Sequence, residues 1–157
     1  MKLIQFDIEL DISTERTIVK QVDEFHISET FLKSPEIISS VVREAFSTEQ
    51  LADEIVFEIA FNTIFKPIGI FLVARGGVSS AFISVRSIFM RAMLLGASSI
   101  VILHNHPSGD PEASKADITS ACKLHDAGKL LDVAVADFIV IGRDSYYSCA
   151  ENHIFKN

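Results

Sequence analysis

Two histidines, a serine and an aspartate lie within one short stretch, HNHPSGDPEASKAD, at positions 104–117. His104 and His106 are two residues apart, so in extended backbone both side chains project from the same face. Seven residues separate His106 from Ser114, and Asp117 follows three positions later. Two imidazole nitrogens and one carboxylate, with water in the fourth position, make an open tetrahedral zinc site of the catalytic kind. The spacing therefore predicts a metal site, provided that the histidines and the aspartate meet in space.

A simpler interpretation of the same residues needs no metal. Ser114 and Asp117 fit a capping box, in which the serine hydroxyl and the carboxylate satisfy the first amides of a helix. An HxH pair in a loop is often solvated, and PSGDP is typical of a tight turn. The occurrence of all these features between an apolar run and a helical pattern favours the metal site. His26, His125 and His153 stand alone in the sequence and are expected at the surface or at helix caps.

The elements that must position these residues follow from hydrophobic periodicity. The apolar run at 98–103 predicts a buried strand that leads into His104, and 114–131 predicts a helix that ends near Gly128. Gly76 and Gly77 are expected to end an earlier strand, and Gly96 to cap an earlier helix. The expected strands cover 3–12, 14–27, 52–63, 67–77, 98–103, 132–142 and 145–151, and the expected helices cover 34–46, 84–98 and 114–131. This interleaving predicts an α/β (α+β) fold with a mixed central β-sheet flanked by helices.

Composition limits the classes of function. The 157 residues are 48% hydrophobic, which is ample for one packed core. A net charge of −7 and a pI near 5.1 make direct nucleic-acid binding an unfavoured expectation, because phosphate contacts need clustered Lys and Arg. Cys122 and Cys149 lack a CxxC spacing, which fits a reducing compartment. The amino terminus is a poor signal peptide and no window reaches about 18 apolar residues, so a cytoplasmic protein without membrane contact is expected.

The spacing resembles a known family. HNHPSGDPEASKAD is similar to the HxHx(7)Sx(2)D core of the JAMM motif of JAB/MPN+ metalloprotease domains, and HNHPSGDP resembles their RadC-like branch. The resemblance runs from about residue 54 to the carboxyl end, through VARGGVSSAFISVRSIFMRAMLLGASSIVILHNHPSG and AGKLLDVAVADFIVIG. It implies a JAB/MPN-like, cytidine-deaminase-like architecture. We therefore expect a RadC-like JAB/MPN domain at 51–157, preceded by a strand and helix extension at 1–50.

The resemblance also implies residue roles. His104, His106 and Asp117 would bind Zn²⁺, and Ser114 would donate to the oxyanion of a tetrahedral intermediate. The family uses an upstream glutamate on the first strand of the domain as general base, and alignment places Glu54 there. Glu58 lies on the same parity of that strand and competes for the role. It is expected instead to be a solvated carboxylate on an edge strand.

Three departures from the family pattern are visible. Ala113 replaces the usual proline before the serine, and Phe138 replaces a histidine that follows Asp137. If that histidine supports a metal ligand without binding the metal itself, catalytic activity would be weaker here while metal binding survives. The helix-hairpin-helix region of long RadC-like proteins has no counterpart in the first fifty residues, which removes the main reason to expect contact with DNA.

Two functions remain open at this point. The favoured one is a zinc-dependent hydrolase of peptide or isopeptide bonds that acts on a peptide or protein substrate. The alternative is a non-catalytic RadC-like module associated with DNA repair or mobile elements, in which the metal is a relic or a structural staple. An oligomer is compatible with either, because the first strand could pair across a dimer.

Overall fold

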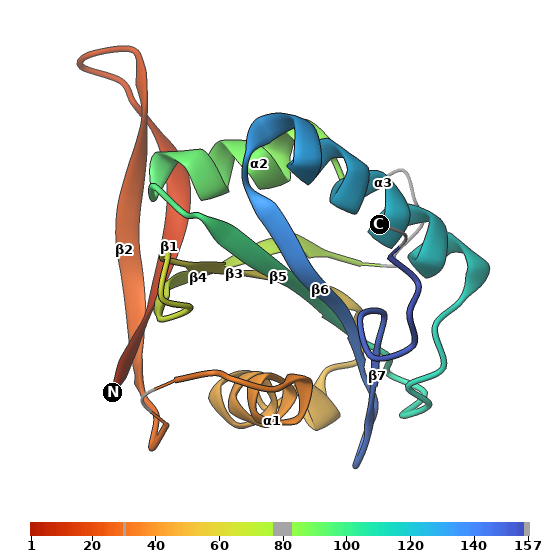
Figure 1. Cartoon of the computed structure of the whole chain (residues 1–157). Helices are drawn as coiled ribbons and strands as arrows, with labels where there is room; N and C mark the ends of the chain where they lie inside the picture. The colour runs from red at the N-terminus through yellow and green to blue at the C-terminus, as the bar shows by residue number, and fades with distance from the viewer. Residues whose placement is uncertain (30, 77–82, 156–157) are drawn as a thin grey trace.

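The computed structural model describes residues 1–29, 31–76 and 83–155. In this part of the chain seven strands form one mixed sheet in the order β2-β1-β4-β3-β5-β6-β7 (Figure 1). Helix α1 covers one face of the sheet, and α2 and α3 cover the other (Figure 1). The predicted class, a mixed central sheet flanked by helices, is confirmed. The elements are β1 (Lys2–Asp11), β2 (Arg16–His26), α1 (Pro35–Phe46), the 3-10 turn η1 (Thr48–Gln50), β3 (Ile55–Phe61), β4 (Pro67–Arg75), α2 (Val85–Leu94), β5 (Ser99–Asn105), α3 (Lys115–Leu131), β6 (Ala134–Ile141) and β7 (Tyr146–Ser148).

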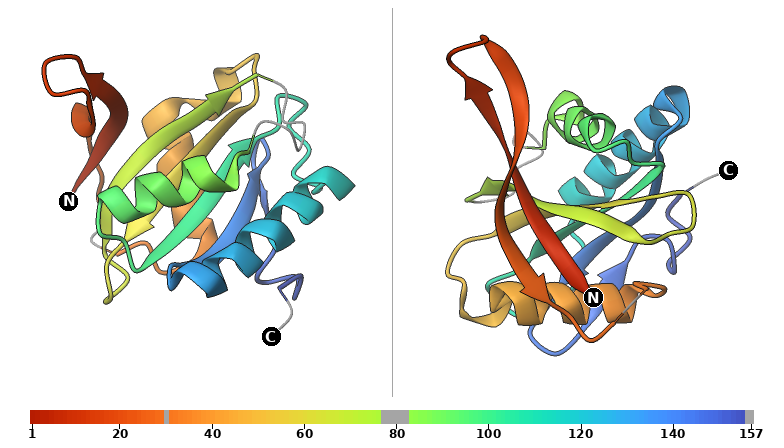
Figure 2. Two further views of the ribbon diagram at one scale, coloured as in Figure 1. Left: turned by 90° about the horizontal axis from the view of Figure 1, so that it is seen from above. Right: turned by 90° about the vertical axis from the view of Figure 1, so that its left-hand side faces the viewer.

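The amino-terminal hairpin is attached to the sheet over a short length. β1 and β2 pair antiparallel along their whole length, whereas β1 pairs in parallel with β4 only at Gln5 and Phe6. The far half of the hairpin therefore projects beyond the helical layers (Figure 2). Leu3 on β1, Ile38 on α1 and Phe57 on β3 belong to one buried cluster, so residues on both sides of position 50 share a core. The division into an extension and a domain at that position stays a prediction.

Helix α1 begins as its sequence predicts. Ser34 lies in extended backbone, and its hydroxyl accepts a hydrogen bond from the Ile37 amide at 3.3 Å. Pro35 occupies the first helical position, where the missing N–H is no loss. The buried side of α1 then packs on the sheet face that carries the odd-numbered residues of β3.

The middle of the sheet is closed to solvent on both faces. Every residue of β3 is buried, because β3 lies between β4 and β5 in the sheet and between helices on either side. β5 is buried from Ile100 to Asn105, and it runs antiparallel to β3 and parallel to β6. β5, α3 and β6 form a βαβ unit, so the carboxyl end of β5 lies where α3 begins. This is the place where the predicted metal ligands occur.

Two details of the expected boundaries can be compared with the structure. β4 ends at Arg75, and Gly76 follows with a φ of +113°, as expected for a strand ended by glycine; Gly77 lies outside the described residues. Gly96 has a φ of +67° just after α2, which agrees with its predicted role as a cap. Within the described part of the chain, no helix is long and apolar enough to cross a membrane.

The expected end of α3 near Gly128 is wrong. The helix continues to Leu131, and Asp132 ends it in the left-handed conformation with a φ of +54°. Gly128 is needed for a different reason, because a Cβ there would lie 2.5 Å from the carbonyl oxygen of Val133, as the chain turns back toward β6. The absence of a side chain at Gly128 thus allows a close approach of backbone to backbone, and this glycine lies inside the helix.

The first prediction concerns this contact. Replacing glycine by alanine inside a helix normally stabilises it by about 1 kcal/mol. Gly128→Ala is expected to do the opposite and to lower the free energy of unfolding by about 1–3 kcal/mol, because the Val133 backbone must shift. Urea unfolding measures this change. Leu130→Ala is the control: its side chain is 86% exposed on the same turn, so a change within about 0.5 kcal/mol is expected. A Gly128→Ala variant as stable as its parent would show that the close approach costs nothing.

Candidate metal centre

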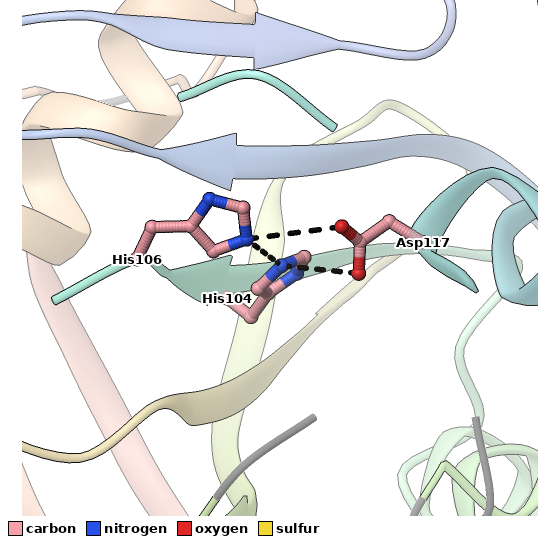
Figure 3. Close-up of side chains that lie close together, drawn as sticks. All are labelled: His104, His106 and Asp117. Carbon is pink, nitrogen blue, oxygen red and sulfur yellow. Dashed lines mark hydrogen bonds and ion pairs between the residues drawn. The ribbon is translucent and has the colours of Figure 1, made fainter. Parts of the chain in front are cut away.

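The end of β5 and the start of α3 bring three potential ligand side chains together (Figure 3). The Nε2 atoms of His104 and His106 lie 3.0 Å apart. His104 Nε2 is 3.3 Å from one carboxylate oxygen of Asp117, and His106 Nε2 is 3.7 Å from the other. A zinc ion with bonds of about 2.0–2.1 Å to tetrahedral ligands requires ligand atoms about 3.3 Å apart. The three side chains therefore fit a small tetrahedral cation as they stand.

The turn between the two elements is held against the end of β6. The His106 amide donates to the Ile141 carbonyl at 2.9 Å, and the Arg143 amide donates to the Gly109 carbonyl at 3.0 Å. Gly109 has a φ of +83°, which closes the turn. Gly142 lets this turn pack closely, since a Cβ there would lie 2.7 Å from the Gly109 carbonyl. The predicted tight path of PSGDP is thereby fixed by backbone contacts.

The electrostatics of the three residues favour a neutral His104, a more basic His106 and an ionised Asp117. Burial lowers the pKa of His104 to about 4, partly opposed by Asp117, so its ring is neutral at neutral pH. The hydrogen bond to Asp117 raises the pKa of His106 above its usual range, although partial burial opposes this. Burial by itself would raise the pKa of Asp117, but contacts with His106, His104 and Ser114 lower it to about 2. The result is a negatively charged pocket that attracts either a proton or a metal ion.

Each histidine needs a partner for its other ring nitrogen if Nε2 is to bind a metal. His106 has one, because its Nδ1 lies 2.8 Å from the Asp110 carbonyl, to which an Nδ1–H donates. His104 Nδ1 is buried and has no hydrogen-bond partner within the described residues. His106 is thus held in the tautomer that a metal ligand requires, whereas the polar contacts of His104 are made through Nε2.

Ser114 and Asp117 form the capping box that the sequence allowed. The Asp117 amide donates to the Ser114 hydroxyl at 3.2 Å, and the Ser114 amide donates to an Asp117 oxygen at 2.7 Å. The hydroxyl also donates to that oxygen, at 2.6 Å. The capping box is thus observed: it starts α3 and also orients Asp117 toward the histidines. The single hydroxyl proton is engaged with Asp117 in this state.

Asn105 is a residue of the site that the pattern of spacing did not identify. It lies between the two histidines and its side chain points to the opposite face of the sheet, toward the start of β3. Its Oδ1 accepts from the Ile55 amide at 2.8 Å, and its Nδ2 donates to the Asp53 carbonyl at 3.1 Å. These two bonds hold the backbone on both sides of Glu54. A polar residue at the end of a buried strand was the available signal.

Glu54 lies immediately before β3, which begins at Ile55, so it precedes the strand on which it was expected. Its carbonyl accepts a hydrogen bond from the Gly76 amide at 2.8 Å, and its side chain is partly exposed. The negative charge of Glu54 contributes to the raised pKa of His106, which places it within electrostatic range of the metal centre. Its catalytic role stays a prediction, as does that of Ser114.

The expectation for Glu58 is wrong. It was expected on an edge strand in contact with water, but β3 is central and the Glu58 side chain is fully buried. Burial raises the pKa of this carboxyl group well above its usual range, and the nearby positive charge of Arg91 only partly opposes this. The predicted strand alternation was right, but the strands and helices that pack around β3 exclude water from this face.

Phe138 lies against the centre from β6. Its ring meets that of His104 edge-on at 5.5 Å between centroids, and it is fully buried. The aromatic ring that replaces the histidine of the family pattern thus packs directly on a candidate ligand. It offers no hydrogen-bond acceptor in its ring plane, so any support from this position is by packing.

The fold is a mixed sheet with helices on both faces. It carries an open His-His-Asp group at the junction of a central strand and a helix. The class is therefore an α/β domain with a possible metal site. The family follows from comparison. The family model described as "RadC-like JAB domain" matches residues 32–154. The chain belongs to this family.

The most similar relatives compared are bacterial proteins named only "UPF0758 protein". The one from Alkaliphilus metalliredigens is 38% identical over 121 residues, which cover 76% of this chain and 51% of the relative. The one from Clostridium perfringens is 30% identical over 128 residues, covering 82% and 56%. The one from Salinibacter ruber is 37% identical over 103 residues, covering 65% and 44%. The chain thus spans about half the length of these relatives, and their names specify no activity.

The second prediction concerns the protonation of the metal-free centre. In a histidine-ring NMR titration, His106 is expected to keep its proton to a pH above the usual value, and His104 to stay neutral down to about pH 4. Asp117→Asn should lower the pKa of His106, because the raising contact is removed. Asp110→Asn is the control, since His106 contacts the backbone carbonyl at that position. Equal titration of His106 in the parent and in Asp117→Asn would contradict the assigned cause.

These shifts also fix the sign of the pH dependence of folding. The pKa of His104 is lower in the folded protein, so its contribution to stability is complete above pH 6.5 and is lost as the pH falls toward 4. The pKa of His106 is raised, so its contribution is complete below pH 6.5 and is lost as the pH rises through the folded value. The two histidines therefore oppose each other, and acid unfolding of the metal-free protein is driven by His104 and Asp117.

Proposed function

We propose that this protein is a zinc-dependent hydrolase of peptide or isopeptide bonds. The observation that carries the proposal is the convergence of two imidazole nitrogens and one carboxylate, whose ligand atoms all lie within 4.8 Å of one another. Membership of the JAB-domain family supports a hydrolase of this general kind. The acidic net charge supports a peptide or protein substrate over a nucleic acid.

The choice of zinc rests on the donor set. Two neutral imidazoles and one carboxylate suit Zn²⁺, whereas Mg²⁺ and Ca²⁺ prefer sites made of oxygen ligands. His104, His106 and Asp117 would hold the ion and leave one position open. A zinc ion bound there would polarise a carbonyl group and acidify a water molecule. The protein's contribution is the fixed triangle of ligands and the orientation of His106 by the Asp110 carbonyl.

Glu54 is proposed as the general base. Its carboxylate would take a proton from the attacking water and return it to the leaving amine. Asn105 fixes the backbone on either side of Glu54 through one buried and one partly buried hydrogen bond, so the proposed base and the proposed ligands are carried by one rigid unit. This coupling supports the assignment, because the distance between the two histidines and the base must stay constant to within a fraction of an ångström.

Ser114 is proposed to donate a hydrogen bond to the oxyanion. Its hydroxyl proton is directed to Asp117 in the metal-free protein, so it must turn away for this role. Once Asp117 shares its charge with a cation, that carboxylate becomes a weaker acceptor, which favours the rotation. The serine would then keep accepting from the Asp117 amide while it donates to the substrate.

The third prediction tests the metal. Purified protein incubated with zinc and then dialysed is expected to retain about one zinc ion per chain by atomic absorption. The double change His104→Ala and His106→Ala should lose it, because one carboxylate cannot hold the ion. Asp110→Ala is the matched control: it removes an acidic side chain from the same turn and keeps the carbonyl that orients His106. A parent protein that retains no zinc, with unchanged thermal stability on zinc addition, would refute the proposal.

The fourth prediction tests the base. Glu54→Gln is expected to retain zinc and to lower hydrolysis of a peptide library by about 10²–10⁴-fold, since the amide cannot accept the proton. Asp53→Asn, which changes the neighbouring exposed carboxylate, should hydrolyse the library like the parent. Equal turnover by Glu54→Gln would show that the base is another group. Zinc binding without any hydrolysis by the parent would favour the non-catalytic module instead.

A further inference from the structure

Two buried polar groups near the metal centre lack hydrogen bonds. Both carboxyl oxygens of Glu58 and the Nδ1 atom of His104 have no partner in the part of the chain that the structure describes. Both side chains have 0% exposure, so no partner from bulk solvent reaches them. Folded proteins satisfy nearly all such groups, and an exception calls for an explanation. Glutamate in particular is rarely buried without a partner.

The sheet register places these two groups side by side. Glu58 on β3 lies opposite Ile102 on β5, and the next pair along is Val56 with His104. Val56 and Ile102 belong to the buried cluster on the side of α2 and α3, so Glu58 and His104 face that same side. They are diagonal neighbours across two hydrogen-bonded strands. Such residues have Cα atoms about 7–8 Å apart, a span that long side chains bridge.

The other neighbours of Glu58 leave its oxygens available. Arg91 on α2 acts on it electrostatically, yet its guanidinium lies over the Phe71 ring at 5.8 Å and its Nη1 donates to the carbonyl and hydroxyl of Ser87. Arg91 balances part of the charge of Glu58 without a hydrogen bond to it among the described contacts. On the far side of His104, Phe138 supplies a ring without an acceptor atom in its plane.

We propose that Glu58 is a positioning residue for His104. When Nε2 of a neutral histidine binds a metal, the ring proton is on Nδ1 and needs an acceptor. The Glu58 carboxylate accepts this proton, fixes the plane of the ring and strengthens the donor nitrogen, as the Asp110 carbonyl does for His106. The role rests on the zinc site proposed above and adds to it a second carboxylate that never touches the ion.

The test separates metal affinity from folding. Glu58→Leu keeps the size of the side chain and removes both oxygens, whereas Glu58→Gln keeps one acceptor. Chelator competition is expected to show zinc binding about 10–100-fold weaker in Glu58→Leu, with Glu58→Gln closer to the parent. Thermal unfolding of the metal-free proteins should change in the opposite direction, with Glu58→Leu more stable because no carboxyl group is left buried without a partner. If Glu58 had a merely structural role, zinc affinity and thermal stability would change in the same direction.

Two further measurements complete the test. In the zinc-loaded parent, the Nδ1–H proton of His104 should give a slowly exchanging, downfield NMR signal that Glu58→Leu shifts or loses. Ile59→Leu is the matched control: it changes a buried residue of β3 on the opposite face of the sheet and should change zinc affinity by no more than about threefold. If the parent binds zinc and Glu58→Leu binds it equally well with the same NMR signal, Glu58 does not support His104. If the parent binds no zinc, the proposed function falls together with this inference.

Discussion

The junction between a buried strand and the helix that follows it is the constraint on which this site depends. β5 ends inside the protein, so the side chains at its end cannot be solvated and must find partners within the fold. The chain then makes one tight turn held against β6 and enters α3 through a capping box. That box satisfies the first amides of the helix and at the same time aims the Asp117 carboxylate back at the strand end. Two imidazoles and a carboxylate meet because ordinary rules of strand and helix ends bring them there.

Successive side chains of a strand point to opposite faces of the sheet, so neighbouring residues of one segment have different roles here. His104 and His106 point to the side of α3, where the third ligand lies, and Asn105 points to the side of α1. Asn105 hydrogen-bonds the backbone around Glu54, so the segment that carries the ligands also fixes the segment that carries the proposed base. A misplacement of either segment would therefore be resisted by these two hydrogen bonds, one buried and one partly buried. The arrangement is typical of sites whose ligands are held by rigid elements and not by loops alone.

Two carboxyl groups are buried near this site, where the low dielectric makes their ionisation costly. Asp117 stays ionised because four hydrogen bonds or charges, from His106, His104 and Ser114, compensate for its burial. Glu58 has a raised pKa and no hydrogen bond among the described residues. A cation bound by His104, His106 and Asp117 would relieve this imbalance. Membership of the RadC-like JAB family and the geometry of the three side chains both support a metal site. The relatives' names give no activity.

From the sequence alone, the group of His104, His106 and Asp117 and most of the elements could be predicted. The spacing of His104, His106 and Asp117 was sufficient because strand periodicity and the capping box act over a few residues, and local rules govern both. The helix at α1 and the hairpin of β1 and β2 were predictable for the same reason. The tertiary structure alone decided what lay beyond local range: that β3 is central and buries Glu58, that Gly128 lies within α3 to admit the Val133 carbonyl, and that Asn105 reaches the start of β3. These depend on which strands become neighbours, and the pairing of segments fifty residues apart is set by the packing of the whole sheet.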